Sequence, residues 1–145
     1  MKSRVDEVLE CFNNGFDCSQ AILSTYCEEF GLDKETALKL SSGLAAGMGR
    51  LCQTCGAVTG AYLVIGLKHG KLSAYDNNAK EKTFELVQEF EKQFVKRNKS
   101  TNCLELLGVD LRNGDKEKAV IQVKQVCPKA VKDAAEILEA VLEMV

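Results

Sequence analysis

The spacing of hydrophobic residues along the chain predicts a series of helices. Val5, Val8, Leu9 and Phe12 recur at intervals of three and four residues, which predicts an amphipathic helix over residues 4–14. The same periodicity, bounded by glycine and Asp or Asn residues, predicts further helices at about 18–30, 33–44, 55–68, 79–97, 103–107 and 128–145. No strand-like segments alternate with these helices.

Residues 116–126 fit two interpretations. Val120, Ile121 and Val123 could belong to a short strand, but one helical face would carry them equally well. Pro128 is predicted to open the last helix, because the first turn of a helix tolerates a missing backbone N–H.

The predicted central helix organises the fold. It carries no charge from Cys55 to Leu67, and Gly56 and Gly60 have a small-xxx-small spacing that allows another backbone to approach closely. That glycine face could pack inside the molecule or form a homodimer. We predict an all-α fold: a compact bundle of about five to seven helices around this buried helix (about 55–68), with residues 1–145 forming one domain.

Composition and charge narrow the class of protein. The chain has 145 residues and a net charge of −2, with acids and bases interspersed, so the sequence gives no basic footprint for nucleic acid. The first residues do not resemble a signal peptide. The longest uncharged run, 51–67, is shorter than the roughly 20 apolar residues that cross a bilayer. We therefore expect no membrane insertion and a cytoplasmic location.

The seven cysteines are the main candidates for chemistry. In a reducing cytoplasm, cysteines bind metals or carry redox chemistry more often than they form a disulfide framework. Cys11 and Cys27 lie inside predicted helices and are expected in the core. The remaining candidates lie at or just before predicted helix starts, where the N-terminal N–H groups favour a thiolate; they are Cys18, Cys55, Cys103 and Cys127.

Cys52 and Cys55 form a C-x-x-C unit. The strand–helix alternation of thioredoxins is missing, there is no second close cysteine pair for a zinc ribbon, and the tandem cysteine run of bacterial ferredoxins is absent. A metal site would therefore be assembled from distant helix ends. Arg50, close to the C-x-x-C unit, could stabilise a thiolate or a cluster.

The order of these motifs resembles that of a known family. The segment Asp17–Ala21 carries Cys18; Cys55-Gly56-Ala57-x-x-Gly60 follows, and Cys103 and Cys127 stand singly. This arrangement resembles the C_GCAxxG_C_C family of redox-active proteins, and the resemblance covers nearly the whole chain. It implies that the four cysteines form the functional set. A related domain in split-Soret cytochromes is associated with an iron–sulfur centre, which makes a cluster the expected cofactor here.

Three functions remain open from the sequence, and whether the protein is an enzyme is undecided. In the first, Cys18, Cys55, Cys103 and Cys127 hold an iron–sulfur cluster that exchanges electrons with an unknown redox partner protein. In the second, Cys55 is a low-pKa attacking thiolate, with Cys52 or another of the four as the resolving thiol. In the third, the same four thiols bind a structural zinc ion. We place the cluster first.

Overall fold

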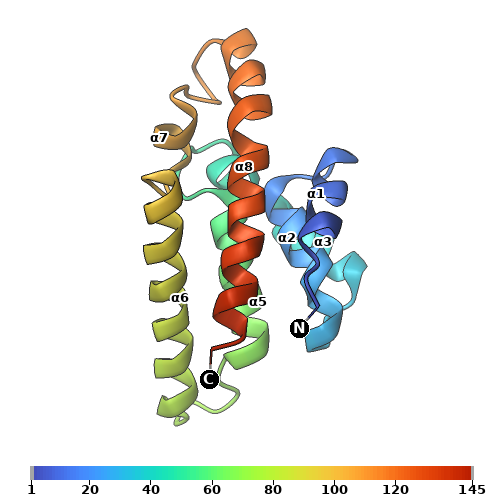
Figure 1. The fold of residues 1–145 in the computed structure, drawn as a ribbon, viewed down its shortest axis with the longest axis vertical. Coiled ribbons are helices and arrows are strands. Elements are labelled where there is room, and N and C mark those ends of the chain that lie inside the picture. The colour runs from blue at the N-terminus through green and yellow to red at the C-terminus, as the bar shows by residue number, and fades with distance from the viewer. Residues whose placement is uncertain (1, 145) are drawn as a thin grey trace.

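The computed structural model describes residues 2–144, and within them the chain is all-α (Figure 1). In that part of the chain, an isolated antiparallel bridge between Thr54 and Asn102 is the one β-type contact. In chain order the helices are α1 (Val5–Asn13), α2 (Cys18–Tyr26), the 3-10 turn η1 (Cys27–Phe30), α3 (Lys34–Ser41), the 3-10 turn η2 (Ser42–Leu44), α4 (Ala45–Gly49), α5 (Gly56–His69), α6 (Asn77–Asn98), α7 (Cys103–Leu107) and α8 (Lys116–Leu142). The predicted fold class is confirmed.

Helix α5 is the buried centre of the bundle. Ala57, Ala61 and Ile65 are fully buried in the main hydrophobic core. Gly60 faces α2 so closely that an added Cβ would lie 3.0 Å from the Ser19 carbonyl oxygen. The glycine face of α5 is therefore an internal contact with α2. Within residues 2–144 no helix is both long enough and apolar enough to cross a membrane.

The long helices α6 and α8 lie side by side and pack on α5, whereas α1–α3 form the other flank of the bundle (Figure 1). Phe90 and Phe94 of α6 are fully buried and stack with ring centroids 6.0 Å apart. Tyr62 of α5 meets the Phe90 ring edge-on at 5.7 Å. Aromatic packing thus fixes α6 against the central helix.

The predicted start of the last helix at Pro128 is wrong. Helix α8 begins at Lys116, where the Asp115 carboxylate accepts hydrogen bonds from the N–H groups of Glu117 (2.9 Å) and Lys118 (3.1 Å), and it runs through Pro128. Val123 and Val126 of its first half pack on a small second core around Leu107, so tertiary contacts outweigh the loss of one backbone hydrogen bond at the proline. Residues 116–126 are therefore helical, and Cys127 lies inside a helix rather than at a helix N-terminus.

A left-handed turn leads into the central helix. Five successive residues, 46–50, have positive φ angles, and so does Cys52 (φ 58°). Glycine adopts this conformation without penalty, but Ala46, Met48 and Arg50 do not. The element labelled α4 is thus a strained turn, and it lies beside the start of α5.

Candidate functional site: four cysteines around one pocket

Cys18, Cys55, Cys103 and Cys127 line one open pocket of about 730 Å³. Each thiol comes from a different segment: the starts of α2, α5 and α7, and the middle of α8. The predicted four-cysteine set is thus brought to one place, although only three of its members lie at helix starts.

The start of α2 positions Cys18. Asp17 and Gln20 form a capping box, in which the Asp17 side chain accepts from the backbone N–H of Gln20 and the Gln20 side chain accepts from the Asp17 N–H (3.0 Å). The buried Ser19 hydroxyl donates to the carbonyl of Ser41 on α3 (2.8 Å). The polar residues around Cys18 therefore have a structural role: they fix the helix end that carries the thiol.

Gly56 allows Cys55 to approach Cys18. A Cβ on Gly56 would lie 2.6 Å from the Cys18 Sγ and 3.1 Å from the Leu44 carbonyl oxygen, so any side chain there would collide with the thiol. With glycine at this position, the Cys55 thiol hydrogen-bonds the Cys18 sulfur. The Cys-Gly-Ala-x-x-Gly motif is therefore a packing motif, in which Gly56 and Gly60 bring α5 against α2.

A short antiparallel contact positions Cys103. On either side of the bridge between Thr54 and Asn102, the Cys55 N–H donates to the Thr101 carbonyl (2.8 Å) and the Cys103 N–H donates to the Gln53 carbonyl (2.6 Å). The Asn102 side chain then caps α7. The chain segments carrying Cys55 and Cys103 are thus held together by backbone hydrogen bonds.

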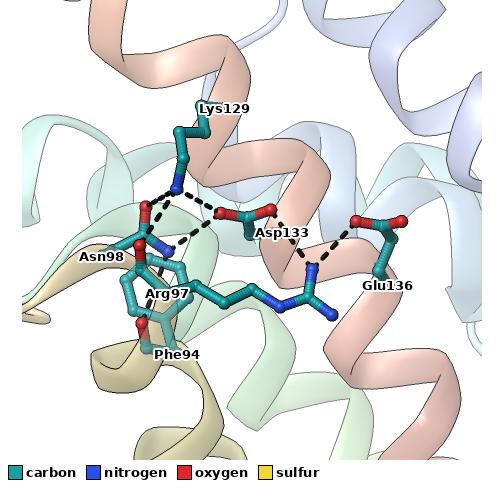
Figure 2. A network of polar contacts seen from close by, with 6 residues as sticks. All are labelled: Phe94, Arg97, Asn98, Lys129, Asp133 and Glu136. Carbon is teal, nitrogen blue, oxygen red and sulfur yellow. Dashed lines mark hydrogen bonds and ion pairs between the residues drawn. The ribbon is translucent and has the colours of Figure 1, made fainter.

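A polar network fixes α8 to the end of α6 (Figure 2). Asp133, nearly buried, accepts from Lys129 (2.7 Å), Arg97 (3.2 Å) and Asn98 (3.2 Å). Lys129 also donates to the Arg97 carbonyl (3.1 Å), one of the carbonyls left unpaired at the end of α6. Lys129 and Asp133 follow Cys127 in α8, and Asn98 ends α6 just before the loop that leads to Cys103, so the network joins the two chain segments that carry these thiols.

The Cys18 thiol is the most acidic of the set. The hydrogen bond from Cys55 and the backbone N–H groups of Ala46 and Ser19 lower the pKa of Cys18 to about 7, against the opposing effects of burial and of Asp17. Ala46 belongs to the left-handed turn, so that strained backbone supplies one of the donors. At neutral pH a substantial fraction of Cys18 is therefore thiolate.

The other three thiols hold their protons. The hydrogen bond given to Cys18, together with burial, raises the pKa of Cys55 well above its usual value. Burial raises the pKa of Cys103 and of Cys127 to about 12, and neighbouring cysteines contribute to both shifts. The sequence predicts the lowered pKa at Cys55; the structure gives it to Cys18, because Cys55 is the donor of the pair.

Cys52 is buried and is not among the residues that line the pocket. Its sulfur accepts the Leu111 N–H (3.3 Å) and lies 3.9 Å from a carboxylate oxygen of Asp110. It also forms a hydrogen bond with Cys103. The C-x-x-C cysteines therefore have different neighbours: Cys55 pairs with Cys18 and Cys52 with Cys103.

The four pocket thiols are not arranged as the ligands of a single metal ion. Within residues 2–144, no group of three or more His, Cys, Asp or Glu side chains is arranged to hold a metal ion. The ligands of an iron–sulfur cluster surround a core of several atoms and stand further apart. Four cysteine thiols are the usual donor set of such clusters, so the donors present fit that group chemically.

The sequence does not reveal the basic residues of the pocket, apart from Arg50. Arg112, Lys116 and Lys124 also line it; in the sequence Arg112 and Lys116 lie in a stretch of mixed charge that is typical of a solvated surface, and Lys124 stands among uncharged residues. Lys124 lies one turn before Cys127 only if a single helix runs from residue 116 through Pro128. The sequence offered a helix for 116–126 as one of two options, but it ended that helix before Pro128. Cys11 and Cys27 lie away from the pocket; Cys27 is fully buried, as predicted, and Cys11 is partly buried.

Comparison with known protein families gives a match that spans most of the chain. A family model described as "Putative redox-active protein (C_GCAxxG_C_C)" matches residues 16–141 and so covers all four pocket cysteines. Searches among curated proteins and among solved structures found no match.

Proposed function

Because the chain belongs to the C_GCAxxG_C_C family of putative redox-active proteins, we propose that it is an electron carrier whose iron–sulfur cluster is held by Cys18, Cys55, Cys103 and Cys127. The observation that supports this proposal is the gathering of four thiols from four chain segments around one pocket. When bound, such a cluster would supply a one-electron redox couple.

The protein's own groups are suited to an anionic cofactor. The N–H groups of Ala46 and Ser19 point at the Cys18 sulfur, and the arginine and lysine side chains around the pocket offset negative charge. Hydrogen bonds to the thiolates and nearby positive charge both stabilise the reduced, more negative state. The backbone and the basic residues would thus tune the potential.

Anaerobic purification, with analysis of iron and acid-labile sulfide, tests the proposal. We expect both elements and a broad visible absorption, each lost in Cys127→Ser and retained in Cys11→Ser, a partly buried cysteine outside the pocket. Far-UV circular dichroism of both variants checks that the fold is intact. A folded protein that takes up neither iron nor sulfide after reconstitution would overturn the proposal.

The Cys18–Cys55 pair supports a second candidate, a dithiol redox protein. The Cys18 thiolate would attack one sulfur of a disulfide in a partner and form a mixed disulfide while the other sulfur leaves as a thiolate. The Cys55 thiol, after losing its proton, would then attack Cys18 and release the reduced partner. Two electrons pass to the partner, and the Cys18–Cys55 pair becomes a disulfide.

Trapping distinguishes this candidate from the cluster. In metal-free protein, Cys55→Ser should accumulate a mixed disulfide at Cys18 with oxidised glutathione, whereas Cys18→Ser should form none. Equal labelling of Cys11 and Cys18 would contradict the dithiol function.

A further inference from the structure

We propose that the mouth of the cysteine pocket is the docking surface for an acidic redox protein. This inference rests on the proposed electron-carrier function and goes beyond it by assigning the chemistry of the partner. Four cationic side chains line the pocket: Arg50, Arg112, Lys116 and Lys124. Among the described residues that line it, Asp17 is the one carboxylate.

This charge is local, because the whole chain has a net charge of −2. None of the four cations forms an ion pair within residues 2–144. Asp110, the nearest acid along the chain to Arg112, instead accepts the backbone N–H groups of Arg112 (2.8 Å) and Asn113 (3.2 Å). The mouth of the pocket is therefore a basic surface on an acidic molecule.

The same mouth carries apolar surface. Val120 lines the pocket with 55% of its surface exposed, and Leu111 beside it is partly buried. A small apolar contact surrounded by charges of one sign is typical of transient complexes, in which electrostatic attraction speeds encounter and keeps affinity modest. For a protein that must release its partner after each electron, this combination is suitable.

The position of the thiols makes the surface functionally useful. Because the exposed basic residues and the buried or half-buried cysteines line the same pocket, a partner attracted by the cations arrives at the redox centre itself. A partner attracted by the net charge would have to be basic. For an acidic partner the two possibilities predict opposite effects of salt: the rate falls with salt if the pocket cations attract the partner, and rises if the net charge repels it.

Stopped-flow rates of electron transfer to and from the cluster-bound protein, measured at several ionic strengths, distinguish attraction by the pocket cations from steering by the net charge. We expect reduction by an acidic flavodoxin to slow as ionic strength rises, and oxidation by basic cytochrome c to quicken or stay constant. The paired change Arg112→Glu and Lys116→Glu should lower the low-salt rate with flavodoxin on the order of tenfold. The control pair Lys92→Glu and Lys96→Glu, exposed on α6, changes the net charge equally and should have little effect. Equal losses in both pairs, or a flavodoxin rate that rises with salt, would overturn the inference.

A second measurement does not depend on the cluster. In metal-free protein, the basic residues should favour alkylation of Cys18 by anionic iodoacetate over neutral iodoacetamide, relative to the same ratio at Cys11. The Arg112→Glu and Lys116→Glu pair should abolish the preference. If the protein takes up no cluster but Cys18 still prefers iodoacetate, only the electron-carrier function is contradicted. If the protein takes up a cluster but its metal-free form shows no preference for iodoacetate, only the docking surface is contradicted.

Discussion

At the scale of single residues, the pairing of Cys18 with Cys55 shows how environment assigns roles to two similar thiols. Both lie at helix starts, so a helix-dipole argument treats them alike. The thiols differ because Cys18 accepts hydrogen bonds from Ala46, Ser19 and Cys55, whereas Cys55 donates one. The direction of a hydrogen bond depends on tertiary contacts, so the sequence could not predict which thiol ionises.

Alkylation should reveal this assignment. In metal-free protein, the rate of Cys18 alkylation by iodoacetamide should rise with pH around a midpoint near 7, because only the thiolate reacts. Replacing Cys55 with Ala removes the donor and should move the midpoint upward. Mass-spectrometric rates across pH 5–10 check this, and an unmoved midpoint would show that the backbone donors alone stabilise the thiolate.

Gly47 is the position at which the left-handed turn has no room for a side chain. Its φ is +65°, and an added Cβ would lie 2.7 Å from the Cys103 Cβ, the Cys52 Cα and the Gln53 nitrogen. Gly47→Ala should therefore lower the free energy of unfolding by about 2–4 kcal/mol, from strain and overpacking together. Gly43→Ala, which meets nothing within 4 Å, is the matched control. Urea denaturation measures both, and equal stability of the two variants would contradict the packing role.

At the scale of elements, the hydrophobic pattern and the helix-capping residues of the sequence predicted most of the helices, including the uncharged central one. The central helix was expected at about 55–68 and spans Gly56–His69, and the predicted helix at 103–107 is α7 (Cys103–Leu107). The error at Pro128 arose because proline often marks a first turn, and the contacts of Val123 and Val126 with the α7 region cannot be read from local sequence. The left-handed turn was also missed, since three of its five residues are not glycine.

Pro128 should cost α8 stability. A proline inside a helix lacks the N–H that would bond to the carbonyl four residues earlier, here that of Lys124. Pro128→Ala should raise the free energy of unfolding by about 1–2 kcal/mol, since the restored bond outweighs the gain in unfolded-chain entropy. Thermal denaturation checks the sign. A less stable variant would show that the proline ring contributes packing beside Cys127.

The network around Asp133 should make the α6–α8 contact sensitive to acid. Although burial opposes ionisation, the hydrogen bond and charge of Lys129, with Arg97 and Asn98, lower the pKa of Asp133. A carboxyl whose pKa is lower in the folded state adds stability above its unfolded pKa, near 3.8, and loses it as pH falls through the folded value.

Asp133→Asn should reduce the free energy of unfolding by about 1.5–3 kcal/mol at pH 7, the range for hydrogen bonds to charged groups. The difference from the unaltered protein should shrink below pH 4. Glu136→Gln, at the exposed edge of the same network, should cost less. Urea titrations at pH 7 and pH 3 test this, and a difference independent of pH would contradict the ionic contribution.

At the scale of the whole molecule, the fold class could be predicted from sequence, but the site only as a set of residues. Four cysteines could be selected by their places near expected helix starts, and they do line one pocket. The hydrogen bond between Cys18 and Cys55, and the presence of Lys116 and Lys124 at the pocket, depend on how α2, α5, α7 and α8 pack together. These are long-range contacts, on which periodicity carries no information.

The distribution of the four cysteines along the chain has a consequence for biogenesis. They are spread from the second helix to the last, so no fragment emerging from the ribosome contains a complete set until α8 has been made and has docked. A cofactor that needs all four thiols can be inserted only into a finished fold. Occupancy would then report that the chain was completed, and a chain shortened before α8 would lack Cys127 and with it the fourth thiol of the pocket.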